Sequence, residues 1–341
     1  MTQDEKYIRR CLQLAENGRQ NARPNPMVGA VITDAHGNII GEGYHIRCGE
    51  AHAEVNAFAD CERRGNNHLL PEATIYVSLE PCAHFGKTPP CADLIIRKGV
   101  KRCVVGCVDS FSEVSGRGIQ RIKDAGIEVT VGVLGEECKE LNRVFFTYHT
   151  KHRPFITLKW AQSADGFIDK DFKPVRISNE KTTMLAHKLR AENDAILVGR
   201  TTLERDNPSL NVREWYGKNP KRFVLTSKHG GVVPSPHHLP EEAILEGWHI
   251  LTTTGSSPLP VEGLGEVLGE VQSLLVEGGA ATHQYFIDND LWDILRIETS
   301  PALLHNGTKA AEIPENAILI SERIYDGNVI REYKNKKLCK K

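Results

Sequence analysis

Strand and helix signals alternate along this chain in two successive runs, and this alternation limits the possible folds more than any other feature. The first run predicts strands and helices from apolar periodicity. The strands are residues 28–32, 39–44, 74–78, 102–106 and 128–133, and the helices lie near residues 7–15, 53–64, 91–98 and 118–124. The short connection between the first two strands predicts a hairpin. The whole run is typical of an α/β domain with helices on both faces of a sheet.

The polar stretch 148–154 interrupts this pattern and ends at Pro154, which predicts a linker. A second run follows, with predicted strands at 155–161, 195–198, 223–226, 273–277 and 294–299 and helices at 180–192 and 279–288. Residues 230–260, rich in Pro, Gly and His, are expected to loop over the surface. Because 341 residues exceed what one core usually fills, we expect two domains, residues 1–148 and 154–341.

The charge balance restricts the partners. Lys and Arg number 43 against 44 Asp and Glu, a net charge of -1, whereas a dedicated nucleic-acid binder needs a basic surplus. No stretch of about 20 apolar residues predicts a membrane span, and the charged first residues do not resemble a signal peptide. Nine cysteines, an odd number, favour a reducing cytoplasm over a disulfide framework. We therefore expect a cytoplasmic protein with small-molecule partners and without nucleic-acid or membrane partners. The sequence leaves open whether the protein forms a homo-oligomer.

The strongest chemical signal is His52-Ala53-Glu54 followed by Glu80-Pro81-Cys82 and Cys91. One imidazole and two thiolates with a fourth position open are typical of catalytic zinc, whereas structural zinc usually has four protein ligands. Glu54 is placed to shuttle protons beside the metal without binding it. H-x-E with a later P-C and a second Cys is the signature of zinc deaminases acting on cytosine-like and adenine-like rings.

Eight residues separate Cys82 from Cys91, whereas the common deaminase signature has two. The segment from Glu80 to Cys91, with 24-PNPMVG-29 and 41-GEGYH-45, resembles the bifunctional deaminase–reductase family of riboflavin biosynthesis, RibD, in which this insert is the rule. The resemblance implies a cytidine-deaminase-like α/β/α sandwich with Zn2+ on His52, Cys82 and Cys91. It also implies that the pyrimidine and phosphate pocket is lined by Asn25, His45, His84 and Lys87.

The second half lacks the G-x-G-x-x-G fingerprint of a dinucleotide fold. Its nearest equivalent is a strand end followed by Gly278-Gly279, where main-chain N–H groups could cradle a diphosphate, although an ordinary strand-to-helix turn has the same appearance. The segments 158-LKWAQSADG-166 and 206-DNPSLNVR-213 resemble the reductase domain of the same family, which has a dihydrofolate-reductase-like α/β fold.

The resemblance assigns two sets of residues in this half. The NADPH-binding residues are Ala161, Thr202, Asp206, Ser227, Gly278, Gly279, Ala280, Ala281 and Thr282. The reductase substrate is assigned to Arg190, Leu210, Arg213 and Glu277. Two arginines suit a ribose phosphate, because the guanidinium fork binds phosphate oxygens in pairs.

Two segments depart from the family pattern. In residues 109–118, Asp109, Gly116 and Gly118 persist, while the usual Asp-Pro-Asn-Pro is missing. In residues 172–178, Arg176 replaces an aromatic residue. These changes concern substrate and cofactor contacts and leave the metal residues intact.

By resemblance, the chain deaminates 2,5-diamino-6-(5-phosphoribosylamino)pyrimidin-4-one and then reduces the ribosyl chain of 5-amino-6-(5-phosphoribosylamino)uracil with NADPH. One rival is a deaminase of RNA or DNA bases, which the charge balance disfavours. Another is an inactive zinc-stabilised scaffold, against which the retained Glu54 argues. A third is a working deaminase with a degenerate reductase half.

Overall fold

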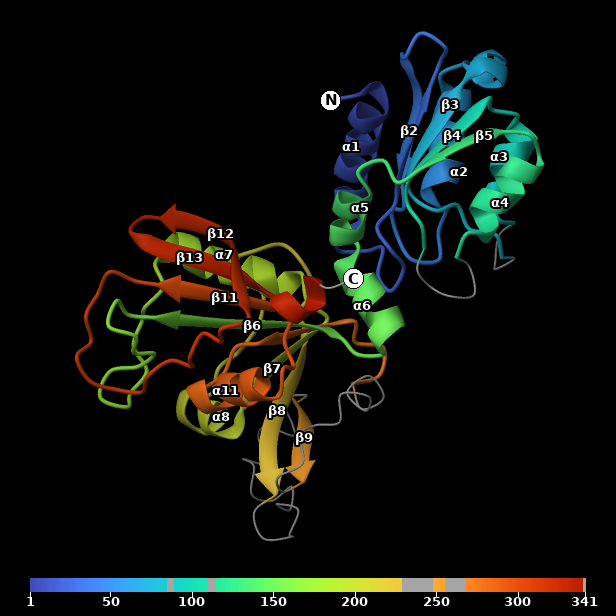
Figure 1. Cartoon of the computed structure of the whole chain (residues 1–341). Coiled ribbons are helices and arrows are strands. Elements are labelled where there is room, and N and C mark those ends of the chain that lie inside the picture. Colours follow the sequence, from blue (N-terminus) through green and yellow to red (C-terminus); the bar gives the residue numbers. More distant parts are fainter. Residues whose placement is uncertain (85–88, 110–114, 229–247, 255–267, 340–341) are drawn as a thin grey trace. The chain divides into compact units, whose positions relative to one another are not determined.

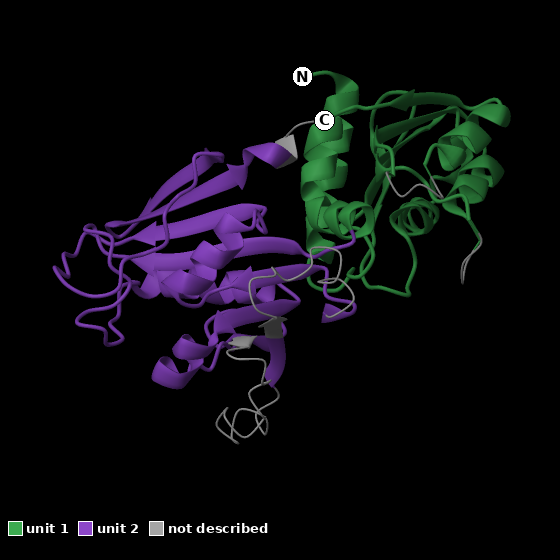
Figure 2. Cartoon of the chain, turned by 60° about the horizontal axis from the view of Figure 1, so that its bottom comes forward, with its two compact units in different colours: residues 1–151 green, residues 152–341 purple. Residues whose placement is uncertain are grey.

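The computed structural model describes residues 1–84, 89–109, 115–228, 248–254 and 268–339. It divides the chain into two compact units, Met1–Lys151 and His152–Lys341 (Figures 1 and 2). Each unit has its own sheet. Among the described residues, no helix is long and apolar enough to cross a membrane.

Unit 1 is a five-stranded sheet in the order β2-β1-β3-β4-β5. Its strands are β1 (Gly29–Thr33), β2 (Ile39–Tyr44), β3 (Thr74–Leu79), β4 (Arg102–Cys107) and β5 (Glu128–Val131). Its helices are α1 (Gln3–Ala15), α2 (Ala53–Arg63), α3 (Cys91–Lys98), α4 (Arg117–Asp124), α5 (Gly135–Leu141) and α6 (Arg143–Lys151). β1 and β2 form the predicted hairpin, while β3, β4 and β5 are parallel.

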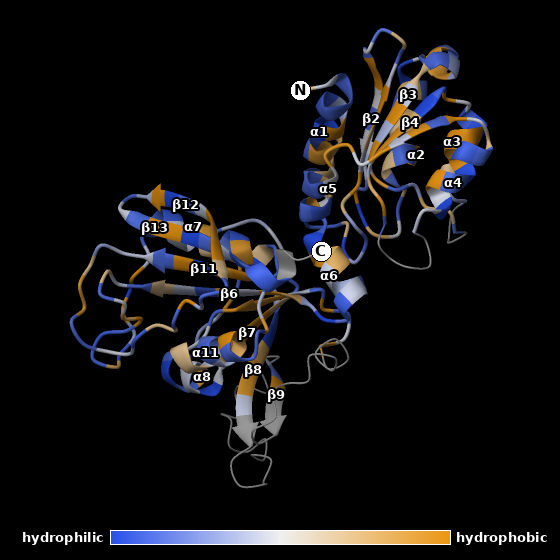
Figure 3. Ribbon diagram, viewed as in Figure 1, coloured by the Kyte–Doolittle hydropathy of each residue, from blue (hydrophilic) through white to orange (hydrophobic). Residues whose placement is uncertain are grey.

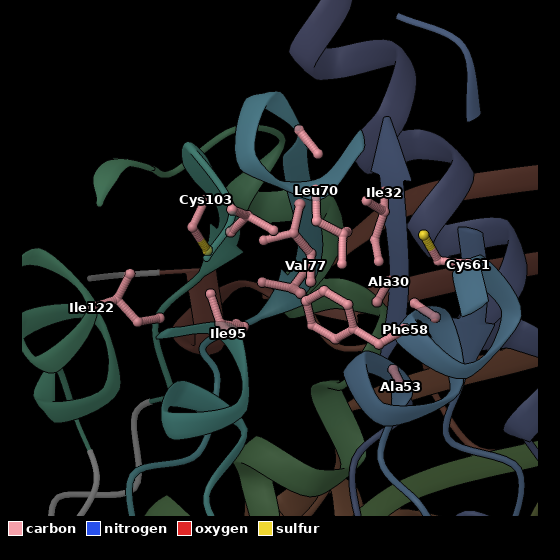
Figure 4. Packing of buried hydrophobic residues seen from close by; sticks show 14 of the residues in the cluster. Ala30, Ile32, Ala53, Phe58, Cys61, Leu70, Val77, Ile95, Cys103 and Ile122 are labelled. Carbon is pink, nitrogen blue, oxygen red and sulfur yellow. The ribbon is translucent and has the colours of Figure 1, made fainter. Parts of the chain in front are cut away.

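Helices cover both faces of this sheet because neighbouring strand residues point to opposite sides. Ile75 and Val77 of β3 pack with residues of α2, α3 and α4, including Phe58 (Figure 4). Tyr76, between them, packs on the other face with Tyr7 of α1 and Cys138 of α5. α1 carries hydrophobic and hydrophilic residues side by side, as an amphipathic helix must (Figure 3). The predicted α/β/α arrangement is therefore confirmed.

Unit 2 is an eight-stranded sheet in the order β12-β13-β11-β6-β10-β7-β8-β9. The strands are β6 (Phe155–Gln162), β7 (Ala195–Gly199), β8 (Lys221–Lys228), β9 (Trp248–Thr254), β10 (Ser273–Val276), β11 (Ile294–Thr299), β12 (Ala317–Tyr325) and β13 (Asn328–Asn335). The helices are α7 (Glu180–Ala191), α8 (Arg200–Asp206) and α11 (Ala280–Asp288). Neighbouring strands are parallel throughout the series β11-β6-β10-β7-β8-β9. At the other side of β11, β13 pairs with it antiparallel, and β12 pairs antiparallel with β13.

A buried ion pair fixes the point where the chain enters unit 2. Arg153 donates from both terminal nitrogens to Asp293, at 2.6 and 2.8 Å, and the two side chains are almost fully buried. The same carboxylate accepts the main-chain N–H of Ile156 at 2.8 Å. β6 is thereby tied to the residue that precedes β11.

The structure corrects three expectations. Residues 148–151, predicted to be linker, form the last turn of α6, which has no buried residue. The stretch 230–260, predicted to be loop, contains β9 at Trp248–Thr254, and the rest of it lies largely outside the described residues. β12 and β13 follow what was predicted to be the last clear strand.

Candidate zinc centre and reductase site

Three metal-binding side chains converge in unit 1. The ligand atoms of His52, Cys82 and Cys91 all lie within 4.8 Å of one another. His52 directly precedes α2, Cys91 is the first residue of α3, and Cys82 follows β3 by three residues. His52 Nδ1 lies 3.6 Å from Cys82 Sγ and 3.3 Å from Cys91 Sγ. The donor set, one imidazole and two thiols, fits zinc with a coordination position left open.

The two thiols of this cluster are electrostatically linked. The pKa of Cys82 is lowered because the Cys91 thiol and then His52 hydrogen-bond to its sulfur. The pKa of Cys91 is raised, first by its hydrogen bond to Cys82 and then by burial. The main-chain N–H of Cys91 also donates to Cys82 Sγ at 3.3 Å. One thiolate therefore forms readily, and a cation at the centre would favour the second.

Glu54 lies in the first turn of α2 and is 3% exposed. Burial raises the pKa of its carboxyl group, and the negative charge of Cys82 raises it further. Its side chain also hydrogen-bonds with that of Cys91. A carboxyl group beside the metal ligands with a raised pKa has the properties of a proton shuttle.

Asn25 and His45, both predicted to contact the pyrimidine, meet next to the metal cluster. Asn25 Nδ2 lies 3.1 Å from His45 Nε2, and His45 Nδ1 lies 3.1 Å from the carbonyl oxygen of Ala51. The rings of His45 and His52 meet edge to face, 5.5 Å apart. Burial lowers the pKa of His45, which favours its neutral form. His84 is exposed two residues after Cys82, and Lys87 lies outside the described residues.

Glu80 organises the segment in which the family pattern is lost. Its buried carboxylate accepts main-chain N–H groups from Asp109 at 3.3 Å, Gly116 at 3.0 Å and Gly118 at 3.0 Å. A side chain at Gly118 would collide with the Pro81 carbonyl. Gly118 is therefore needed for this close approach, and Gly116 for its φ of 76°, whereas residues 110–114 lie outside the described part of the chain.

Several predicted cofactor residues of unit 2 lie where β7 and β10, neighbouring parallel strands, end. A Cβ at Gly278 would collide with Val198 of β7, and one at Gly279 would come within 3.1 Å of Thr202 Oγ1. Gly279 has a φ of 63°, a conformation that favours glycine. Thr282 is buried in the first turn of α11, which begins with Ala280 and Ala281.

The other predicted cofactor residues are spread over unit 2. Ala161 is near the end of β6, and Asp206 is the exposed last residue of α8. Ser227 is near the end of β8, and its side chain lies outside the described part. In residues 172–178, which depart from the family pattern, Arg176 is exposed and donates to the carbonyl of Ser178 at 3.1 Å.

The predicted reductase-substrate residues form one connected group. Arg190 donates to both carboxylate oxygens of Glu277, at 3.1 and 2.7 Å, and to the carbonyl of Asn211 at 3.2 Å. Burial opposes ionisation of Glu277, but Arg190 outweighs it and the pKa of Glu277 is lowered. The Arg213 side chain is 57% exposed and donates to Asn211 Oδ1 at 3.0 Å. Leu210 is buried beside them and lines a cavity of about 590 Å³.

The sequence reasoning missed three residues that shape these sites. His187 accepts the main-chain N–H of Arg213 at 3.2 Å from within α7, and Asn211 contacts both arginines. Asn142, 2% exposed, binds the main chain of Met27. Only Asn211 carried a sequence signal, its place inside the segment 206–213.

Comparisons with known proteins agree with this geometry. Residues 1–107 match the family described as cytidine and deoxycytidylate deaminase zinc-binding region, and residues 154–315 match the RibD C-terminal domain. The riboflavin biosynthesis protein RibD of Aquifex aeolicus is 37% identical over 327 residues, covering 91% of this chain and 90% of that protein. RibD of Bacillus amyloliquefaciens is 34% identical over 334 residues, an alignment that covers 91% of this chain and 87% of that protein.

A solved structure from Thermotoga maritima, a diaminohydroxyphosphoribosylaminopyrimidine deaminase/5-amino-6-(5-phosphoribosylamino)uracil reductase, covers 98% of this chain and 99% of its own, with a TM-score of 0.83 and 33% identity. These matches confirm the predicted fold class, an α/β chain with a cytidine-deaminase-like unit followed by the α/β reductase unit of the same family. Fold and site thus define an enzyme that joins a zinc-dependent deaminase to a reductase that uses a nicotinamide cofactor. The chain belongs to the RibD family, the bifunctional deaminase–reductases of riboflavin biosynthesis.

Proposed function

We propose that unit 1 hydrolyses the 2-amino group of 2,5-diamino-6-(5-phosphoribosylamino)pyrimidin-4-one, and that unit 2 reduces the ribosyl chain of the deaminated product with NADPH. The observation that carries the deaminase half is the convergence of His52, Cys82 and Cys91 within 4.8 Å with buried Glu54 beside them. The deaminase and reductase activities for which the Thermotoga maritima protein is named support this choice of substrates.

In unit 1, His52, Cys82 and Cys91 would hold zinc, which when bound supplies a Lewis acid that lowers the pKa of a coordinated water. Glu54 takes a proton from the attacking water and delivers protons to the departing amine, so that ammonia leaves. Its burial favours this exchange, because burial disfavours the carboxylate, raises the pKa of the group and so makes it a stronger base for the proton of water. Asn25, oriented by His45, hydrogen-bonds the pyrimidine edge, while His84 and Lys87 contact the phosphate.

In unit 2, the turn Gly278–Thr282 with Thr202 binds the diphosphate of NADPH through main-chain N–H groups and a hydroxyl. The close packing of Gly279 against Thr202 supports this placement, since a side chain there would occupy the approach to the turn. Ala161, Asp206 and Ser227 complete the cofactor site. We infer NADPH over NADH from the family resemblance, and comparing the Michaelis constants of the two cofactors tests that choice.

The reductase substrate is held by Arg190, Leu210, Arg213 and Glu277. Arg190 is already paired with Glu277, so Arg213, whose guanidinium is largely exposed, is the better placed of the two arginines for the phosphate. Glu277, fixed by Arg190, accepts hydrogen bonds from ribosyl hydroxyls. NADPH, when bound, would supply the hydride that reduces C1′ of the ring-opened or imine form of the ribose, and the unit itself contributes orientation rather than a nucleophile.

A single protein preparation tests both halves. The diaminopyrimidine ribotide is incubated with the zinc-loaded chain and NADPH, and ammonia, NADPH oxidation and product mass are measured together. Glu54→Gln should lose deamination by at least about 10²-fold, the lower end of general acid–base contributions. It should keep its zinc and still reduce substrate that another enzyme has deaminated.

Glu62→Gln, an exposed glutamate on the same helix, is the matched control and should behave like the parent. Parent-like ammonia release from Glu54→Gln would refute the assigned proton shuttle. Reduction lost together with deamination in a folded, zinc-loaded Glu54→Gln would refute the separation of the two activities.

We also propose a cytoplasmic homo-oligomer. The eight cysteines whose side chains the structure describes are all free, as a reducing compartment requires. β12 is an edge strand with exposed apolar side chains at Ile318, Leu319, Ile320 and Ile324, and two copies of an edge strand can pair about a twofold axis. Light scattering on the parent and on Ile320→Lys tests this, and a monomeric parent would contradict it.

A further inference from the structure

Asn142 lies directly after α5, and its side chain pairs with the main chain of one distant residue. Its Oδ1 accepts the N–H of Met27 at 2.8 Å, and its Nδ2 donates to the carbonyl of Met27 at 2.9 Å. Asn142 is 2% exposed. The carboxamide therefore does for Met27 what a neighbouring strand would do, across 115 positions of sequence.

The segment that Asn142 holds carries Asn25. Residues 25–28 belong to no helix or strand, because β1 begins only at Gly29. From this segment Asn25 reaches His45 at 3.1 Å, and His45 lies edge to face against the metal-binding His52. A continuous series of contacts thus connects Asn142 to the deaminase site, although among the described residues the side-chain hydrogen bonds of Asn142 go to Met27 and not to the site itself.

We propose that Asn142 is a positioning residue of the deaminase, which holds residues 25–28 so that the amide of Asn25 faces the pyrimidine. This inference rests on the proposed role of Asn25. A buried N–H and carbonyl left without partners are unfavourable, so a segment that loses Asn142 shifts to pair its main chain elsewhere. The zinc ligands lie directly before α2, at the start of α3 and three residues after β3, outside this segment.

The consequence is a defect in substrate binding with the metal chemistry kept. Asn142→Leu removes both hydrogen bonds and keeps a branched side chain with the same number of heavy atoms. Asn142→Asp keeps the acceptor for the Met27 N–H and places an anion against the Met27 carbonyl. Both variants should raise the Michaelis constant for ammonia release by at least about tenfold, with kcat within about twofold of the parent. Zinc content and reduction of the deaminated substrate should equal the parent's.

Arg102→Met is the control for a purely structural effect. Arg102 lies at the amino end of β4, whereas Cys82 follows the carboxyl end of the parallel strand β3. Arg102 donates to both carboxylate oxygens of Asp4, at 2.9 and 2.8 Å. Its loss should lower the thermal midpoint of unit 1 with an unchanged Michaelis constant. Asn142 variants that only lower the midpoint, like this control, would overturn the proposal.

A double-mutant cycle tests whether Asn142 acts through Asn25. Asn25→Ala alone should raise the Michaelis constant, and adding Asn142→Leu or Asn142→Asp to it should have little further effect. If Asn25→Ala has a large effect and the Asn142 variants multiply it independently, Asn142 does not position Asn25 and the inference fails alone. If Asn25→Ala leaves the Michaelis constant unchanged, the proposed role of Asn25 fails and takes this inference with it.

Discussion

His283 makes the stability of unit 2 depend on pH in a way that can be calculated. It is 2% exposed in α11, its Nε2 lies 3.1 Å from the carbonyl of Val276, and its ring packs against Trp160. Its pKa is lowered to about 4, chiefly by burial and also by the positive charge of Lys159, whereas the hydrogen bond to Val276 and the charge of Glu277 oppose the shift. The ordinary value in an unfolded chain is 6.5.

Above pH 6.5 the imidazole is neutral in both states and costs nothing. Below it, His283 binds a proton in the unfolded state but stays largely neutral in the folded state, so the free energy of unfolding falls as pH decreases towards 4. The loss at pH 5 is about 2 kcal/mol, and it approaches about 3.4 kcal/mol well below pH 4, from about 1.36 kcal/mol per unit of pKa difference. His283→Gln removes the titrating group and should make the unfolding of unit 2 less pH-dependent by this amount.

The four tryptophans provide the assay because all of them, residues 160, 215, 248 and 292, belong to unit 2. Urea unfolding followed by tryptophan fluorescence at pH 7.5 and pH 5.0 therefore reports that unit alone. The parent should lose about 2 kcal/mol more than His283→Gln between the two pH values. His305→Asn, at an exposed position, should lose as much as the parent. Equal losses in the parent and His283→Gln would refute the reasoning.

Three further predictions concern the sites. Cys82→Ser should reduce the zinc content by metal analysis, whereas Cys61→Ser, which replaces a buried cysteine outside the cluster, should not. Gly279→Ala should raise the Michaelis constant for NADPH several-fold and leave ammonia release intact, because the φ of 63° and the contact with Thr202 oppose any side chain. Arg213→Ala should slow reduction and let the deaminated intermediate accumulate in product analysis. Retained zinc, an unchanged Michaelis constant or undiminished reduction would contradict the respective assignment.

The sequence predicted the strands of unit 1 and the convergence of its metal residues because both depend on local patterns. Each metal residue directly precedes, begins or closely follows a regular element, so the order of elements already brings them to one end of the sheet. Asn142 had no comparable signal. An asparagine after a helix is an ordinary helix end, and its pairing with Met27 depends on the complete fold of the unit.

The elements that the sequence did not predict lack its usual signals for identifiable physical reasons. β12 is an edge strand, and most of its residues are exposed, so apolar alternation is absent. α6 has no buried residue, and its polar end looked like a linker although rings such as Phe145 and His149 still meet one turn apart at 4.4 Å. Pro154 does mark the end of a helix, but it follows the last helical residue by three positions, as prolines commonly do.

Both units place their proposed chemistry at the carboxyl ends of parallel strands. In unit 1, Cys82 follows β3 and the Asp109 segment follows β4, and Glu80 joins the two through main-chain hydrogen bonds. In unit 2, Gly278 follows β10 and Thr202 follows β7. Parallel strands end at one edge, where the following helices direct their N-termini and unpaired N–H groups towards a ligand. Asp109 and Gly116, which the changed segment retains, lie on such a connection between β4 and α4, whereas His52, Cys82 and Cys91 border other elements of the unit.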